Sequence, residues 1–310
     1  MTHQFNDPQR PRLSRTFYRA HGLGNDYLVA EAGDDWLAQP RAVEAVCHRT
    51  EGVGSDGLVT LLTDSEPFQL RMFNPDGGEF ERSGNGLRIL GSWLHRTGRV
   101  AEAPFRIRTG GDEVRMQVHS VDDQGLYDIS VEMGRAGVGS AAVALDPTAV
   151  DASGNRGLDG ATAFALPDGS AALLTPISIG NPHAVVWGAP EMFGAVREAD
   201  MLRIGAMLAT HPAFANGINV QIARVIDAAT VEILIWERGV GPTSASGTSS
   251  CAVAVAAVVT GQVPPGEIRI TMPGGEMRVT VSAELDVILR GPVQAVGQGE
   301  IDPGFLAGLA

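Results

Sequence analysis

The feature that most constrains this 310-residue chain is an internal repeat, in which polar residues recur in the same order and at the same spacing. Asn74 and Ser83 are nine residues apart (83 − 74 = 9), and so are Glu237 and Ser246 (246 − 237 = 9). A single offset of 237 − 74 = 163 residues relates the two pairs. Because a shared order with a shared spacing rarely arises by chance, the pattern indicates two related domains.

Two further pairs extend the repeat. Asp56 and Asn219 are separated by the same offset (219 − 56 = 163), and Asn25 of GNDYLV matches Asn181 of GNPHAVV at 181 − 25 = 156. In both of these motifs a Gly-Asn pair leads into a short apolar run. The sequence therefore predicts that the halves place polar side chains at equivalent positions.

Alternating apolar residues predict strands in both halves. The stretches FRIRTGG (105–111) and GEMRVTVS (275–282) have the period of two that is typical of half-exposed strands. The run VEILIWE (231–237) predicts a buried strand that ends at the polar residues of the repeat. Each half therefore contributes β-structure.

Helices are predicted beside the two serines. Leucines between 87 and 94 recur with helical spacing, and Gly98 ends the pattern. The segment 251–259 is apolar on every side, so it predicts a fully buried helix. A third helix is expected over 40–49, where proline occupies the first position.

These elements predict an α+β fold with two pseudo-symmetric domains, each a β-sheet or barrel wrapped around a central helix. We expect the following organisation: a flexible leader at 1–15, an N-terminal domain at 16–134 plus 288–310, and a C-terminal domain at 135–287.

Composition argues against several classes of partner. The formal net charge is −13 and Lys/Arg clusters are lacking, so neither nucleic acid nor an anionic membrane is an expected partner. The N-terminus lacks the apolar core of a secretory signal, and the apolar run 252–259 is far shorter than the roughly 20 residues of a membrane span. Cys47 and Cys251 are expected to be reduced and buried. We expect a soluble cytoplasmic protein.

The two predicted helix N-termini are candidate anion sites, because such ends present unpaired N–H groups and the positive end of the helix dipole. If the domains pack about a pseudo-twofold axis, Ser83 and Ser246 lie on opposite faces of one small anionic substrate. That geometry suits removal of a proton from one face of a carbon and its return on the other. The ordinary structural explanation is that each serine caps its helix.

Amide side chains near glycines suit a polar zwitterion, although they are also common in turns. These asparagines are Asn25, Asn74, Asn85, Asn181 and Asn219. Glu237 and Arg238 could pair with an ammonium and a carboxylate group, or form a surface pair. His183 follows a proline and is expected to be a structural hydrogen-bonding residue rather than a base.

Six motifs in one order give the sequence a specific resemblance. They are HGLGNDYLV (21–29), GVGSDGL (52–58), FNPDGGEFERSGNGLR (73–88), GNPHAV (180–185), GINV (217–220) and ERGVGPTSASGTSSCA (237–252). With them the chain resembles the diaminopimelate epimerase family, within a wider fold shared with proline racemases and phenazine-biosynthesis isomerases. The resemblance implies an enzyme that needs neither cofactor nor metal and inverts the α-carbon of LL- or meso-diaminopimelate, often as a homodimer.

The resemblance also implies roles for individual residues. Ser83 and Ser246 match the two catalytic positions. The side chains that would hold the amino-acid substrate are Asn25, Asn74, Asn181, Asn219, Glu237 and Arg238. The residues whose backbone N–H groups would hold the α-carboxylate are Gly84, Asn85, Gly247 and Thr248.

Serine is the main departure from the family, whose members use cysteine at both catalytic positions. A cysteine has a pKa of about 8.5, which a helix N-terminus lowers to about 3.5–7.5. A serine hydroxyl starts several units higher, so it stays protonated near neutral pH unless a neighbouring base assists it. The expectation is an epimerase with impaired or altered activity.

Three explanations for the serines are open. The first is that they replace two natural cysteines in an engineered epimerase, in which Cys47 and Cys251 were left intact. The second is that they are native to a divergent isomerase or dehydratase, which acts on another small amino or hydroxy acid. The third is that they belong to a protein that kept the cleft, lost catalysis and only binds a small molecule.

Overall fold

The structure is a computed structural model, and it describes residues 10–80, 82–146, 162–165, 171–188 and 197–309. The chain divides into two compact units: unit 1 contains Met1–Glu132 and Gly291–Ala310, and unit 2 contains Met133–Arg290. Two long strands, β9 (Leu126–Arg135) and β19 (Asp286–Glu300), contribute residues to both units.

Unit 1 combines strands with three helices among its described residues. Besides β9 and β19, its elements are β1 (Arg12–Gly22), β2 (Asn25–Ala32), β3 (Trp36–Leu37), α1 (Pro40–Cys47), β4 (Leu58–Leu61), β5 (Phe68–Phe73), β6 (Glu79–Phe80), α2 (Gly84–Arg96), β7 (Phe105–Thr109), β8 (Asp112–Val121) and α5 (Pro303–Ala307).

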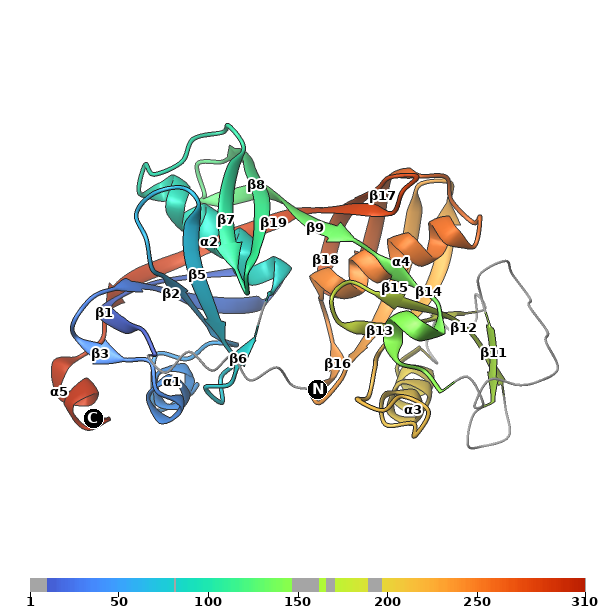
Figure 1. Ribbon diagram of the computed structural model, residues 1–310, viewed down its shortest axis with the longest axis horizontal. Helices are drawn as coiled ribbons and strands as arrows, with labels where there is room; N and C mark the ends of the chain where they lie inside the picture. The colour runs from blue at the N-terminus through green and yellow to red at the C-terminus, as the bar shows by residue number, and fades with distance from the viewer. Residues whose placement is uncertain (1–9, 81, 147–161, 166–170, 189–196, 310) are drawn as a thin grey trace. The chain divides into compact units, whose positions relative to one another are not determined.

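The strands of unit 1 form a closed ring around α2 (Figure 1). Pairing runs in the order β19, β1, β2, β4, β5, β7, β8 and β9, and β9 pairs with β19 again. The pairs β2–β4 and β5–β7 are parallel, whereas the other neighbours in the ring that have a recorded register are antiparallel. Leu87, Leu90 and Leu94 of α2 are fully buried, because they face the inside of this ring.

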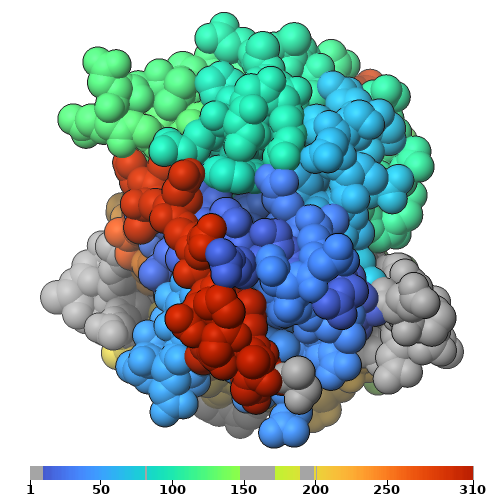
Figure 2. All heavy atoms as spheres, turned by 90° about the vertical axis from the view of Figure 1, so that its left-hand side faces the viewer, coloured from blue at the N-terminus to red at the C-terminus, as the bar shows by residue number. Residues whose placement is uncertain are grey.

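The start of the chain differs from the prediction of a leader that extends to residue 15. Arg12–Arg15 belong to β1, where Leu13 is fully buried and pairs with Trp36 and Ala32. Burial of Leu13 in the core explains why this segment is ordered. The first nine residues lie outside the described part. On the face that Figure 2 shows, the red C-terminal residues run over the blue N-terminal ones, in line with the antiparallel β1–β19 pair.

Unit 2 has the same kind of architecture. Besides its parts of β9 and β19, its elements are β10 (Gly137–Val138), η1 (Ser140–Val143), β11 (Thr162–Ala165), β12 (Ala171–Ser178), β13 (Pro182–Trp187), α3 (Arg197–Ala209), β14 (Asn219–Asp227), β15 (Thr230–Glu237), β16 (Gly241–Thr243), α4 (Gly247–Val259), β17 (Gly266–Met272) and β18 (Gly275–Val281).

The strand order of unit 2 repeats that of unit 1. The sheet runs from β12 through β13, β14, β15, β17 and β18 to the first part of β19. Its parallel pairs, β13–β14 and β15–β17, are the counterparts of β2–β4 and β5–β7. The segment Cys251–Ala257 of α4 is fully buried, as its uniform apolar character predicts.

The repeat in the sequence is a repeat in the structure. Helix α2 begins at residue 84 and ends at 96, and adding the offset of 163 gives 247 and 259, the bounds of α4. The predicted α+β fold with two similar halves, each with a central helix, is confirmed. The predicted strands at 105–111, 231–237 and 275–282 and the helix at 40–49 are also present as β7, β15, β18 and α1.

Candidate active site

Ser83 is the N-cap residue of α2, and its hydroxyl group is engaged there. The backbone of Ser83 is extended (φ −125°, ψ 122°), and its Oγ accepts a hydrogen bond of 3.1 Å from the backbone N–H of Gly86. This bond satisfies one of the N–H groups that a helix leaves unpaired at its start. The structural role expected of a serine in this position is therefore realised at Ser83.

Two predicted substrate residues of unit 1 lie together next to this cap. Asn85 Nδ2 donates to the backbone oxygen of Asn25 at 2.7 Å and to its Oδ1 at 2.8 Å. A Cβ atom at Gly22 would overlap Asn85 Oδ1, so only glycine permits this close approach. The two-residue turn Leu23–Gly24, with φ of 53° and 93°, places Asn25 at the start of β2.

A network of ion pairs holds the side chain of Asn25 in place. Asn25 Nδ2 donates to Asp56 Oδ2 at 2.8 Å, and Arg49 bridges Asp56 and Asp26 with Nη2–oxygen distances of 2.6 and 2.7 Å. Arg19 also contacts Asp26 at 2.7 Å. Burial by itself would raise the pKa of Asp26, but the hydrogen bonds from Arg49 and Arg19 outweigh burial and hold this pKa below its ordinary value.

The other predicted residues of unit 1 are placed differently. Asn74 follows β5 in an exposed turn, in which its backbone N–H donates to Gly78 at 2.8 Å. Among the described contacts, no side-chain hydrogen bond joins it to the Asn25–Asn85 pair. Gly84 opens α2 and is buried, while Arg88 in the next turn is fully buried and donates to Asn85 Oδ1 at 3.2 Å.

Ser246 is the N-cap residue of α4, and it differs from Ser83. Its backbone is also extended (φ −153°, ψ 127°), yet its side chain makes no capping hydrogen bond. Its backbone oxygen accepts from the N–H and the hydroxyl of Ser250 at 3.1 and 2.8 Å. Gly247 and Thr248, which follow in the first turn, are buried and half-buried. The hydroxyl of Ser246 is therefore not committed to its own helix.

Neutral side chains support this second helix N-terminus. Gln221 Nε2 lies 2.9 Å from Ser249 Oγ and 3.1 Å from His183 Nδ1, while His183 Nε2 lies 2.9 Å from Asn181 Oδ1. Burial lowers the pKa of His183 to about 3, so the ring is neutral near pH 7. His183 is thus a buried hydrogen-bonding residue, as its place in the sequence predicts.

Asn219 and Arg238 form a second contact in unit 2. Asn219 Nδ2 donates to the backbone oxygen of Pro182 at 3.1 Å, and its Oδ1 accepts from the backbone N–H of Arg238 at 3.0 Å. The guanidinium of Arg238 donates to the backbone oxygen of Asn216 at 2.6 Å. Glu237 is the last residue of β15 and is half-buried. The GINV and ERG motifs are therefore neighbours in space.

The sequence did not identify several residues of these supports, namely Arg19, Asp26, Arg49, Arg88, Gln221 and Ser249. The signal for Gln221 was available, because it lies two residues after Asn219 and so points to the same face of β14. Asp26 and Arg49 gave no such signal, since their pairing depends on contacts between segments 23 residues apart.

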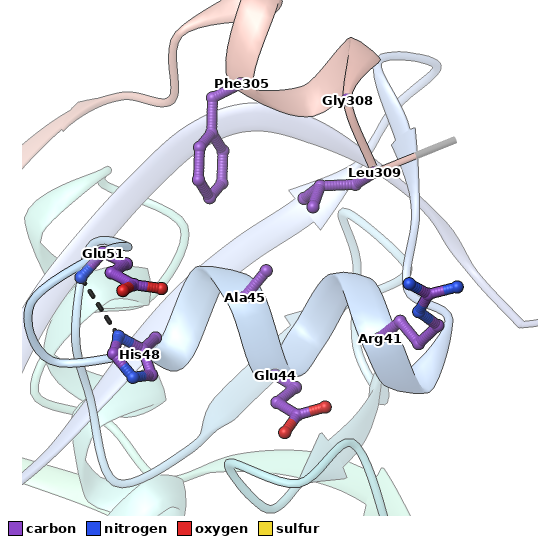
Figure 3. A pocket seen from close by; sticks show the side chains of 8 residues that line it. All are labelled: Arg41, Glu44, Ala45, His48, Glu51, Phe305, Gly308 and Leu309. Carbon is purple, nitrogen blue, oxygen red and sulfur yellow. Dashed lines mark hydrogen bonds between the residues drawn. The ribbon is translucent and has the colours of Figure 1, made fainter.

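A separate hollow lies between α1 and α5 in unit 1 (Figure 3). Its volume is about 460 Å³, and Figure 3 shows Phe305 and Leu309 on one side and Ala45 on the other. The ring of His48 at its edge accepts a hydrogen bond of 3.1 Å from the backbone of Glu51. None of the lining residues is a predicted site residue, and the charged ones are exposed.

Within the described ranges, no group of three or more His, Cys, Asp or Glu side chains is placed to hold a metal ion. No helix in this part of the chain is long and apolar enough to cross a membrane. Cys47 and Cys251 are both buried, and neither forms a disulfide.

A family model described as diaminopimelate epimerase matches the chain twice, over residues 17–138 and 175–296. The chain belongs to the diaminopimelate epimerase family. It is 35% identical to diaminopimelate epimerase 2 of Nostoc sp. over 294 residues, which cover 94% of this chain and 97% of the relative. It is also 34% identical to the diaminopimelate epimerase of Desulforudis audaxviator, with 92% and 98% covered.

Solved structures share the fold at lower identity. A hydroxyproline epimerase from Agrobacterium vitis, with bound trans-4-hydroxy-L-proline, has a TM-score of 0.63 at 14% identity and covers 94% of both chains. A phenazine biosynthesis protein from Bacillus anthracis has a TM-score of 0.61 at 14% identity, with 93% of this chain and 98% of the other covered. These likenesses show that the chain shares the fold of these two proteins.

Proposed function

We propose that this chain inverts the α-carbon of diaminopimelate without a cofactor, with Ser83 and Ser246 as the two proton-transfer positions. The observation that supports this most is the repeat of the two helix N-termini, at residues 83–84 and 246–247, in a chain of this family. Inversion needs one group for each face of the α-carbon. The repeat supplies two such groups in equivalent settings.

The proposed binding groups follow from the same motifs. The backbone N–H groups of Gly84, Asn85, Gly247 and Thr248 would hold the α-carboxylate, because helix N-termini favour negative charge. The proposed side-chain contacts to the remainder of the substrate come from Asn25, Asn74, Asn181, Asn219, Glu237 and Arg238. We also propose that the protein acts in the cytoplasm as a homodimer, which size-exclusion chromatography with light scattering tests.

Serine sets the expected rate. A general base works best when its pKa lies near the working pH, and a serine hydroxyl is far above it. Helix N-termini stabilise the deprotonated form but do not lower the pKa enough for substantial ionisation. At Ser83 the bond that Oγ accepts from the Gly86 N–H favours the deprotonated form in the same way, and it is likewise too weak to ionise a serine near pH 7. We therefore expect slow proton transfer in the serine form.

Exchange of the α-proton tests the proposal. The chain is incubated with LL-diaminopimelate in D2O, and the α-proton signal is followed by NMR. The Ser83→Cys/Ser246→Cys double variant is expected to exchange about 10³-fold faster than the serine form, within the range of general acid–base catalysis. A Ser83→Ala/Ser246→Ala variant is the matched control. No exchange in either the serine or the cysteine form would overturn the proposed function.

The capping bond of Ser83 favours a second candidate, a protein that binds an amino acid without turning it over. The bond from Gly86 gives the Ser83 hydroxyl a structural role that requires no proton transfer. Calorimetry separates the two candidates when it is run beside the exchange experiment. Binding of diaminopimelate with no exchange in the serine form, but exchange in the cysteine form, identifies a binding protein on an epimerase scaffold.

A further inference from the structure

A row of hydrogen-bonded side chains leads from Asn181 to the first turn of α4. His183, Gln221 and Ser249 are all fully buried, whereas Asn181 is partly exposed. His183 belongs to β13, Gln221 to β14 and Ser249 to α4, and Asn181 directly precedes β13. The row therefore joins these three elements. A change at its centre therefore reaches both the helix N-terminus and Asn181.

The orientation of the Gln221 side-chain amide decides which atoms of this row donate hydrogen bonds and which accept them. Its Nε2 contacts both His183 Nδ1 and Ser249 Oγ, while its Oε1 is buried with no hydrogen-bond partner among the described residues. If the amide were reversed, an NH2 group with two donors would be buried unpaired in place of one carbonyl oxygen. Two unpaired donors cost more free energy than one unpaired acceptor. Gln221 is therefore the donor in both contacts.

The donor role of Gln221 fixes the ring of His183. Since Nδ1 accepts from Gln221, a neutral imidazole carries its proton on Nε2. Nε2–H then donates to Asn181 Oδ1 at 2.9 Å. The carbonyl oxygen of Asn181 is thereby occupied, and its Nδ2 is left to donate to other groups.

We propose that Gln221 is a positioning residue, which sets the direction of this row so that Asn181 offers N–H donors to the substrate. A carboxylate can accept from such donors, whereas an ammonium group requires an acceptor. Gln221 in this way selects a carboxylate group at Asn181. The inference rests on the proposed function only in taking the ligand to be an amino acid.

The first test needs no ligand. The chain is labelled with 15N-histidine, and the ring signals of His183 are assigned by comparison with a His183→Gln variant. At pH 7 we expect a neutral ring with the proton on Nε2 and none on Nδ1. A proton on Nδ1, alone or together with one on Nε2, would overturn the proposal. This result does not depend on whether the protein binds or turns over diaminopimelate.

Two substitutions then test the role of Gln221. In Gln221→Glu the carboxylate can only accept, so Nδ1 of His183 is expected to gain a proton. In Gln221→Met both donors are lost, and the affinity for diaminopimelate measured by calorimetry is expected to fall about tenfold, as for loss of one hydrogen bond to a charged group. The exposed Gln69 provides a matched control, Gln69→Glu, that should leave the affinity unchanged.

The outcomes separate the two proposals. Equal affinity of the Gln221→Met variant and the unmodified chain overturns the positioning role, even if diaminopimelate binds well. If the unmodified chain binds no diaminopimelate, the proposed function fails, and the proton position on His183 still decides the direction of the row. Ser249→Ala, which removes only one acceptor, should keep the proton on Nε2 and serves if Gln221→Met does not fold.

Discussion

The N-termini of α2 and α4 have the same backbone but different side-chain surroundings. Both helices span 13 residues and begin after a serine with an extended backbone. Each is followed by a C-cap threonine with φ −89° and ψ 3°. Ser83 caps its helix, whereas the hydroxyl of Ser246 makes no capping bond. The first is supported by ion pairs around Asp26 and Arg49, and the second by the neutral row through His183 and Gln221.

This difference follows from burial. Arg49 and Asp56 expose 50% and 40% of their side chains, so these two charges remain partly solvated, whereas the buried Asp26 is compensated by its ion pairs with Arg49 and Arg19. His183 and Gln221 are fully buried, where a charge would carry a large desolvation cost. The two units thus share the position of the helix N-terminus and differ in the side chains that support it. The two supports are expected to fail under different conditions.

The largest expected difference is the response to acid. The folded-state pKa of His183 is lowered to about 3, so the unfolded chain binds a proton below about pH 6.5 that the folded chain excludes. Stability from this group is present above pH 6.5 and falls by about 1.4 kcal/mol per pH unit as the pH drops towards 3. Urea unfolding between pH 7.5 and 5 measures it in the unmodified chain and in His183→Gln.

The slope should be about 1.4 kcal/mol per pH unit smaller in His183→Gln than in the unmodified chain. The exposed His48 provides the control, because His48→Gln is expected to keep the full slope. Equal slopes for the unmodified chain and His183→Gln would show that His183 is not held neutral by burial.

The ionic support of unit 1 should respond at lower pH. The pKa of Asp26 lies below its ordinary value, so its contribution is present above about pH 4 and is lost as the pH falls through the lowered pKa. Asp26→Asn is expected to reduce the free energy of unfolding by about 2 kcal/mol at pH 7. The difference should shrink at pH 3. Asp34→Asn, at a fully exposed aspartate, should leave stability unchanged.

The smallest difference concerns the two caps. Ser83→Ala removes the bond to Gly86 and is expected to cost about 1 kcal/mol of stability. Ser246→Ala removes no capping bond, and we expect a loss within about 0.5 kcal/mol. Thermal unfolding of both variants in parallel measures the pair. Equal losses would contradict the distinction between a committed and an uncommitted hydroxyl.

The sequence predicted those features that depend on local pattern. The 163-residue offset located both helix N-termini, and apolar periodicity located β15 and the buried α4. It did not indicate that Ser83 caps and Ser246 does not, because both serines precede glycine in the same way. That difference depends on side-chain placement in three dimensions.

The sequence also did not predict contacts between segments that are far apart along the chain. Gln221 contacts His183 and Ser249, which are 38 and 28 residues away in the sequence. The residues around Gln221 do not indicate either contact. The polar residues around Leu13 predict a leader up to residue 15, whereas Leu13 is buried in β1. Local composition is a weak guide where a single side chain anchors a strand.

We propose that Ser83 and Ser246 serve opposite faces of one α-carbon, and single cysteine variants test this assignment. Ser83→Cys and Ser246→Cys are each incubated in D2O with LL-diaminopimelate and with meso-diaminopimelate, and loss of the α-proton is followed by NMR. Each variant is expected to exchange the α-proton of one configuration only, and the two variants are expected to prefer opposite configurations. Exchange of the same configuration by both variants would show that the two residues do not serve opposite faces.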